Sequence, residues 1–302
     1  MRCGRLPGRL EAMRVSLNIT NYSWPEGAPG LASRLGGVVR AADEAGLDTV
    51  WVSDHLIQAD PTSTPEAEML EAYTVLGFLA GQTRRVGLGT MVTGVTHRPA
   101  ALLVKAVTTL DVLTGGRAWL GIGAGYHEEE GRAMGLPLPP VAERFERLEE
   151  TLRLAIRMWS GDETPFEGRH LRAERPLGSP RPLSSPRPPI LIGGMGERRT
   201  LPLVARYADA CNLFDIPDGG QTVRRKLEVL ARHCEELGRP YDAIGKTLST
   251  RLDPRETAES FAGRCAALAE LGIGHVVVIT GGPWTEESVG TLGAAASQVR
   301  SL

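Results

Sequence analysis

Short apolar runs rich in Val, Ile and Leu alternate along this chain with longer segments that repeat apolar residues every third or fourth position. The short runs predict strands, and the longer spacing predicts amphipathic helices. Regular alternation of the two indicates a parallel sheet covered by helices. The predicted strands are Met13–Ile19, Thr49–Ser53, Val86–Val92, Ala118–Ile122, Pro189–Gly193, Ala208–Leu213, Gly245–Ser249 and His275–Thr280.

Eight strand–helix units in about 270 residues predict an α/β fold of the (β/α)8 barrel type, which typically takes about 250 residues. The alternative is an open, doubly wound sheet. That fold requires a glycine-rich turn after its first strand, whereas Asn18–Tyr22 contains no glycine. We therefore expect one barrel domain over residues 13–302, preceded by an N-terminal extension at residues 1–12.

Capping residues predict the ends of three helices. A helix at 99–113 begins with Pro and stops at two glycines, and a helix at 143–159 is followed closely by Gly161. A third helix, at 253–272, begins at the predicted N-cap Asp253, which Pro follows.

One stretch interrupts the alternation. Glu174–Pro189 contains six prolines and no helix or strand pattern, which predicts an extended surface segment. It lies in an insertion at about 162–189, before the fifth strand. Because long loops are often active-site lids, we expect this insertion to build the substrate pocket together with the loops after the first, seventh and eighth strands. The alternative is a mobile surface excursion without a role.

The charge balance excludes some classes of partner. With 34 Lys and Arg against 36 Asp and Glu, the net charge is -2, so no global field attracts nucleic acid or a membrane surface. No apolar run approaches the roughly 20 residues of a membrane-spanning helix, and residues 1–12 lack the apolar stretch of a signal peptide. We therefore expect a cytoplasmic protein that acts on a small molecule.

The four cysteines are Cys3, Cys211, Cys234 and Cys265. They stand far apart, with no C-x-x-C and no histidine spacing that suits zinc. We interpret them as free thiols and expect no metal site.

In a (β/α)8 barrel, functional residues gather at the carboxyl ends of the strands. Asp54 and His55 follow the second predicted strand. Because histidine exchanges protons near neutral pH, we predict that His55 donates a proton or binds a ligand carbonyl, with Asp54 beside it. The remaining histidines for which we predict structural or surface roles are His97, His170, His233 and His275.

A glycine-rich turn, Gly193–Gly196, follows the fifth predicted strand and precedes a helix expected to start near 198–201. Bare backbone N–H groups and a helix start favour a phosphate, which Arg198 and Arg199 would help to bind. The alternative is a turn without a ligand.

A second glycine motif, Gly121–Gly125, follows the fourth strand and ends at Tyr126. Three missing side chains leave a slot for a flat ring, although Tyr126 is equally interpretable as a core residue. We interpret Glu128–Glu130 as the solvated start of a helix. The sequence contains no G-x-S-x-G, H-E-x-x-H or Walker A motif, so serine hydrolases, zinc proteases and P-loop enzymes have no support.

Five segments, in the order TVWVSDH, VGLGTMVT, TGGRAWLGIGAGY, PPILIGGMGERRTL and YADACNL, resemble the luciferase-like flavin and deazaflavin oxidoreductases. The likeness is strongest to the branch that uses coenzyme F420, and it covers Met13 to about Ile279. It implies a (β/α)8 barrel with an insertion before the fifth strand, an oxidoreductase that transfers hydride to or from F420, and a homodimer. Two alternatives remain: an FMN-dependent monooxygenase that uses reduced flavin and oxygen, and a ligand-binding barrel without catalysis.

The resemblance also implies site residues. His55 and Asp54 would be catalytic and face the cofactor ring, and Met91–Val92 would form a non-prolyl cis peptide that bulges the third strand against that ring. The segment 124–126 would line the ring and ribityl region, and 193–196 would hold the phosphate. The cofactor-binding residues that it implies are Asp54, His55, Met91, Val92, Thr93, Ala124, Gly125, Tyr126, Gly193, Gly194, Met195 and Gly196.

One position departs from the family pattern. Some deazaflavin sugar-phosphate dehydrogenases carry an acidic proton donor after the fourth-strand glycines, where this chain has Tyr126. The resemblance therefore implies neither a sugar-phosphate substrate nor a general acid at this position, and the substrate stays unidentified. The cofactor itself implies hydride transfer, because a deazaflavin has carbon in place of the reactive ring nitrogen and does not readily activate oxygen.

Overall fold

The computed structural model describes residues 13–60 and 63–300. Their long sheet is parallel throughout and has the order β3-β2-β1-β11-β10-β9-β8-β5-β4. Its strands are β1 (Arg14–Ile19), β2 (Thr49–Val52), β3 (Gly87–Thr90), β4 (Thr93–Gly94), β5 (Leu120–Gly123), β8 (Ile190–Gly193), β9 (Ala210–Phe214), β10 (Gly245–Arg251) and β11 (His275–Ile279).

The sheet closes on itself between β3 and the start of β5. Leu88 and Ala118 form a parallel bridge, Leu88 N donates to Arg117 O at 2.9 Å, and Trp119 N donates to Leu88 O at 2.8 Å. The predicted (β/α)8 barrel is thus confirmed. The predicted third strand, Val86–Val92, contains only β3, because the chain bulges at Met91–Val92, and the short strand β4 follows beyond the predicted end.

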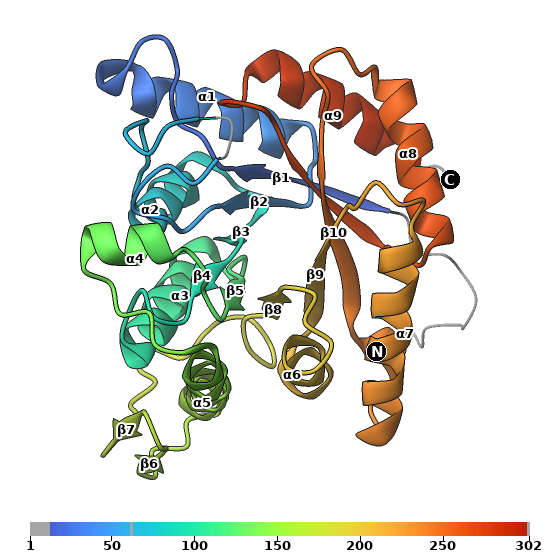
Figure 1. Cartoon of the computed structure of the whole chain (residues 1–302). Helices are drawn as coiled ribbons and strands as arrows, with labels where there is room; N and C mark the ends of the chain where they lie inside the picture. Colours follow the sequence, from blue (N-terminus) through green and yellow to red (C-terminus); the bar gives the residue numbers. More distant parts are fainter. Residues whose placement is uncertain (1–12, 61–62, 301–302) are drawn as a thin grey trace.

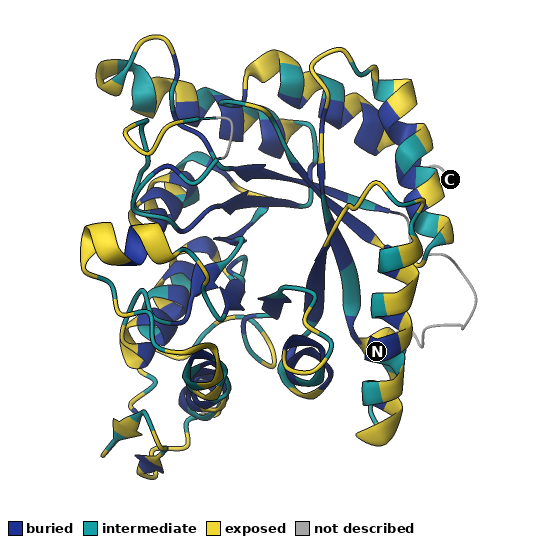
Figure 2. Cartoon of the chain, in the orientation of Figure 1, coloured by how far each residue is buried: buried dark blue, intermediate teal, exposed yellow. Residues whose placement is uncertain are grey.

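Helices surround the strands (Figure 1). Apart from the short α4, whose buried residues are Glu130 and Gly131, they turn a buried side toward the barrel and an exposed side outward (Figure 2). Among the described residues, no helix combines the length and apolar character needed to cross a membrane. The α-helices are α1 (Leu31–Glu44), α2 (Ala72–Gln82), α3 (Ala100–Thr114), α4 (Glu128–Met134), α5 (Val141–Ser160), α6 (Thr200–Tyr207), α7 (Gln221–Glu236), α8 (Ala258–Glu270) and α9 (Glu286–Val299).

The interior of the barrel is packed with large side chains. Because successive strand residues face opposite ways, Trp51 on β2 belongs to a different buried cluster from its neighbours Val50 and Val52. The Trp51 ring meets the Trp119 ring edge-on, with 5.6 Å between centroids. The middle of the barrel is therefore a filled core.

Two of the three predicted helices have the expected ends. α3 and α5 both stop at a glycine with positive φ, Gly115 (φ 71°) and Gly161 (φ 76°). Glycine adopts this left-handed conformation without steric cost.

The predicted start of the third helix is wrong. α8 begins at Ala258, and the Thr257 side chain caps it by accepting from Ser260 N. Asp253 instead closes a separate turn, in which its carboxylate accepts from Arg255 N at 2.8 Å. The segment thus contains two residues that can cap a helix, Asp253 and Thr257, and the helix starts after the second.

The insertion before β8 lies on the surface. It contains a short antiparallel hairpin, β6 (Phe166–Glu167) with β7 (Arg172–Ala173), and then the irregular Pro-rich segment. The buried carboxylate of Asp111 on α3 anchors this segment by accepting from Leu183 N at 2.7 Å and Ser184 N at 2.9 Å. The predicted N-terminal extension, residues 1–12, lies outside the described residues.

Candidate functional site

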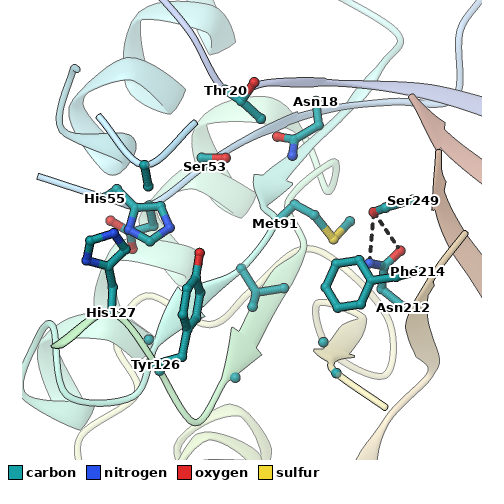
Figure 3. Close-up of a pocket in the computed structure, with 18 of the residues that line it drawn as sticks. Asn18, Thr20, Ser53, His55, Met91, Tyr126, His127, Asn212, Phe214 and Ser249 are labelled. Atoms are coloured by element: carbon teal, nitrogen blue, oxygen red, sulfur yellow. Dashed lines mark hydrogen bonds between the residues drawn. The ribbon is translucent and has the colours of Figure 1, made fainter. Parts of the chain in front are cut away.

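One large cavity of about 920 Å³ opens at the carboxyl ends of the barrel strands. Figure 3 shows side chains from opposite sides of the barrel, among them His55 and Ser249, converging on it. The predicted site residues that line it are Asp54, His55, Met91, Val92, Ala124, Gly125, Tyr126, Gly193 and Gly194. Thr93, Met195 and Gly196 are not part of its lining, and neither is any residue of the insertion at 162–189, so the expected contribution of the insertion to the pocket is wrong.

The Met91–Val92 peptide bond is cis, as the family resemblance implies. The Val92 side chain lies between two glycines. A Cβ added at Gly123 or at Gly193 would come within 3.0 Å of Val92 Cγ2. These two glycines therefore make room for Val92 itself, and less of the expected slot remains for a ligand ring.

Asp54 anchors the segment next to this bulge. Its carboxylate accepts from Thr93 Oγ1 at 2.7 Å and from both terminal nitrogens of Arg98, at 2.5 and 3.0 Å. Arg98 also binds Glu71 and lies over the Tyr73 ring, 4.7 Å from its centroid. Although burial disfavours its charge, the two carboxylates raise the pKa of Arg98. The buried Asp54 carboxylate is thus held by Arg98 and Thr93.

His55 is held by a carboxylate that the sequence analysis placed in solvent. Glu130 is only 1% exposed, and its Oε2 lies 2.9 Å from His55 Nδ1, while Oε1 accepts from Leu56 N at 2.5 Å. Glu128 and Glu129 on the same helical turn are exposed, as expected. Burial alone would raise the pKa of Glu130, but the hydrogen bonds from His55 and Leu56 N lower it to about 2.

His97 also lines the cavity, contrary to its predicted structural or surface role. Its Nε2 lies 3.9 Å from Glu130 Oε2, and its buried Nδ1 has no hydrogen-bond partner among the residues that the structure describes. Burial lowers the pKa of His97, against the opposing effect of Asp54 and Glu130. The surroundings of His97 therefore disfavour its charged form.

Three aromatic side chains gather around His55. Its ring centroid lies 5.8 Å from that of Tyr126, 5.6 Å from His127 and 6.4 Å from His97. Tyr126 is 70% exposed, so it is not the core residue of the alternative interpretation. In Figure 3 its ring stands in the cavity between His55 and Met91.

The glycine turn after β8 presents Gly193 and Gly194 to the cavity. Gly194 has a φ of 118°, and a Cβ at Gly196 would lie 2.9 Å from Thr200 Oγ1. The predicted reinforcement by Arg198 and Arg199 is wrong, because both side chains are exposed outside the cavity lining. Arg199 instead lies over the Phe145 ring.

A cationic side chain also lines the cavity near this glycine turn and Gly125: Arg144, on α5. It is 8% exposed, its Nη1 donates to Gly125 O, and its Nε finds no hydrogen-bond partner in the described ranges 13–60 and 63–300. Within the described part of the chain, Arg144 forms no ion pair. A buried charge without a counter-ion is costly, so this geometry indicates an anionic ligand.

The opposite wall of the cavity is polar and combines amide and hydroxyl side chains with the charged Asp215, Arg251 and Arg264. Asn212 on β9 donates through Nδ2 to Ser249 Oγ on β10 at 2.9 Å (Figure 3). Asn18 on β1 is 4% exposed, and its Oδ1 has no partner among the described residues. Hydroxyl and amide groups of this kind bind the hydroxyl or carbonyl groups of a small molecule.

Comparisons with known proteins agree with this architecture. The family model of the luciferase-like monooxygenases matches residues 13–273. An F420-dependent glucose-6-phosphate dehydrogenase of Kineococcus radiotolerans is 32% identical over 251 residues, which cover 77% of this chain and 68% of the relative. A protein of the same name from Nakamurella multipartita is 35% identical over 241 residues, covering 78% and 69% of the two chains.

A third relative, the F420-dependent hydroxymycolic acid dehydrogenase of Mycobacterium tuberculosis, is 29% identical over 218 residues and covers 70% of this chain and 57% of its own. Among solved structures, an F420-dependent secondary alcohol dehydrogenase in complex with an F420-acetone adduct superimposes with a TM-score of 0.78 at 17% identity, covering 94% and 99% of the two chains. A monooxygenase of Streptomyces bottropensis gives the same TM-score and identity, covering 94% and 98%. The chain belongs to the luciferase-like monooxygenase family.

Proposed function

We propose that this protein is an oxidoreductase that transfers a hydride between coenzyme F420 and a small organic substrate that is still to be identified. The observation that carries the proposal is the large cavity at the carboxyl end of the barrel. It combines the bulge at Met91–Val92, the unpaired Arg144 and His55, whose Nδ1 lies 2.9 Å from Glu130 Oε2. The names of the curated relatives support F420 as the cofactor.

The residues present fit such a cofactor. Its anionic phosphate group matches the buried, unpaired charge of Arg144 and the exposed backbone of Gly193 and Gly194. We assign Met91 and Val92 to the ring face, with Thr93 holding the bulge through its bond to Asp54. We assign the segment 124–126 to the ring and ribityl region.

When bound, a deazaflavin accepts or donates a hydride at its central ring carbon. The chain supplies orientation and the accompanying proton. His55 uses Nδ1 to bind Glu130, which leaves Nε2 for a substrate oxygen. The carboxylates of Asp54, Glu130 and Asp215 are each paired within the protein, so we assign proton transfer to His55. We assign Asp54 a positioning role, because Arg98 holds its carboxylate.

The test is equilibrium binding of oxidised F420 and of FMN, side by side, by fluorescence titration of the purified protein. We expect tight binding of F420 and weak or no binding of FMN. Preference for FMN, with oxygen uptake that depends on reduced FMN, would instead support the monooxygenase. Binding of F420 without turnover on any of a panel of alcohols and carbonyl compounds would support a ligand-binding barrel.

A substitution in the glycine turn tests the phosphate assignment. We expect Gly194→Asp to abolish F420 binding, because its carboxylate would repel the phosphate. Gly194 has a positive φ, so any side chain strains the backbone. Gly194→Asn has the same shape without the charge and is the matched control. Equal affinity of the two variants would refute the phosphate assignment.

Two further assignments rest on the sequence. We propose a homodimer and a cytoplasmic location. Exposed apolar side chains on the neighbouring helices α2 and α3 support the dimer: Phe78 is 37% exposed, Leu102 56% and Leu113 73%. The free, buried thiols of Cys211, Cys234 and Cys265 are compatible with a reducing compartment.

A further inference from the structure

We propose that Glu130 is a positioning residue that holds the proton of neutral His55 on Nδ1 and thereby presents a bare Nε2 to the cavity. The geometric part of this inference concerns the protein alone. Its consequence for catalysis rests on the proposed function.

The contacts of Glu130 determine which ring nitrogen of His55 donates a hydrogen bond to its carboxylate. The carboxylate can only accept hydrogen bonds. One oxygen, Oε1, accepts from Leu56 N at 2.5 Å, and the other, Oε2, lies 2.9 Å from His55 Nδ1. His55 Nδ1 must therefore carry the proton of that contact. Because Leu56 N belongs to the backbone, the carboxylate cannot rotate without losing this bond.

Glu130 also contacts a second histidine, at the start of α4. Glu130 N donates to His127 Nδ1 at 3.0 Å, so the His127 side chain caps α4. An acceptor nitrogen carries no proton, so the ring of His127 is the neutral tautomer with its proton on Nε2. His55 and His127 thus have opposite tautomers, although their ring centroids lie only 5.6 Å apart.

Glu130 is the only carboxylate in the described residues with an oxygen within hydrogen-bond distance of the His55 ring. The adjacent Asp54 is bound to Arg98. His97 Nε2 lies 3.9 Å from Glu130 Oε2, beyond a hydrogen bond. The titratable or charged groups that face or adjoin His55 are Glu130 and His127 on or at α4, Tyr126 after β5, His97 and Arg98 after β4, and Asp54 after β2.

This arrangement prepares His55 for proton transfer in either direction. When a substrate alcohol is oxidised, the carbon loses a hydride to the cofactor and the hydroxyl loses a proton to Nε2. The carbonyl product and an imidazolium stabilised by Glu130 result. In the reverse direction, Nε2 returns the proton to the oxygen of the carbonyl. With the other tautomer, Nε2 would already carry a proton and could not accept one.

The experiment determines the tautomer of His55 in the cofactor-free protein. Protein labelled with ¹⁵N-histidine is studied by long-range ¹H–¹⁵N correlation at about pH 9, well above the usual pKa of histidine of about 6.5. The variant His55→Gln assigns the signals. We expect a protonated Nδ1 and a bare Nε2 in the wild type. In Glu130→Met, which removes the acceptor at similar length, we expect the proton to move to Nε2, the form that free neutral imidazole side chains prefer in water.

Glu129→Met makes the same change one residue earlier, at an exposed position, and should leave the His55 tautomer unchanged. A wild-type His55 protonated on Nε2 would overturn the inference, and this outcome does not require any variant to fold. An unchanged tautomer in a folded Glu130→Met protein would overturn it as well. F420 binding is measured separately, so failure of the proposed cofactor and failure of the Glu130 assignment are distinguishable.

Discussion

Arg144 is a buried arginine that forms no ion pair with the described residues. Hydrogen bonds between charged groups contribute about 1.5–3 kcal/mol. We therefore expect Arg144→Gln to weaken F420 binding by about tenfold to a hundredfold, measured by fluorescence titration. Arg147→Gln, one turn further along α5, is the control, because Arg147 is bound to Glu143. Equal affinities of the two variants would exclude Arg144 as the anion ligand.

Glu130 also makes stability depend on pH. Its pKa falls from an ordinary value of 4.5 to about 2 on folding, so the folded state binds its proton less readily than the unfolded state does. The resulting stabilisation is complete above about pH 4.5 and is lost as the pH falls toward about 2. In urea unfolding, the wild type should exceed Glu130→Met in stability at pH 6, and this difference should shrink between pH 4.5 and 3. A constant difference would contradict the prediction.

At the scale of single residues, sequence patterns locate the side chains at strand ends and miss those that a helix contributes. His55, Met91 and Gly194 could be found because strand ends meet at one edge of a barrel. Glu130 could not, because a charged residue in the first turn of a helix usually faces solvent. Arg144 was hidden for the same reason, in an amphipathic pattern that also contains exposed arginines.

At the scale of secondary-structure elements, glycines fix how closely β3 and β5 approach. A Cβ at Gly121 would lie 1.7 Å from Thr90 O, a backbone atom that cannot yield. We expect Gly121→Ala to destabilise the protein by about 3 kcal/mol or more. Gly263→Ala, at an exposed position of α8, has no atom within 4 Å of the added Cβ and should stabilise the protein by about 0.5–1 kcal/mol. Thermal unfolding of the two variants measures both effects, and a neutral Gly121→Ala would contradict the close approach.

Element boundaries were predictable where a glycine or proline ends an element, as at the end of α3 and α5. They were not predictable where two nearby residues are equally able to cap a helix and a tertiary contact decides between them. Both Asp253 and Thr257 are good capping residues, and the helix begins after Thr257. Arg264 on α8 binds the Glu256 carboxylate at 2.8 Å, which fixes the preceding turn as a loop.

At the scale of the whole molecule, the exposed apolar side chains of α2 and α3 predict self-association. We expect light scattering after size exclusion to give twice the mass of the chain. Leu102→Glu should yield monomers, because the charge would be buried at the interface. Leu237→Glu, at an exposed position just after α7, should leave the dimer intact. A monomeric wild type would refute the homodimer.

The barrel as a whole could be predicted from the alternation of strands and helices, because few folds accommodate eight such units. The position of the Pro-rich segment relative to the cavity could not. It depends on the buried Asp111, which binds Leu183 N and Ser184 N from a distance of more than 70 positions in the sequence. A contact of this range leaves no local pattern.

The packing of Val92 between Gly123 and Gly193 makes that side of the cavity a fixed half. The side lined by β1 and β10 is the adjustable half. On the fixed half, even one added methyl group meets neighbouring atoms, so substitutions there disturb the fold together with the site. On the adjustable half, Asn18, Ser249 and Thr250 line the cavity near the carboxyl ends of β1 and β10. A library built to change which compound this enzyme accepts should therefore randomise the adjustable half and leave the fixed half untouched.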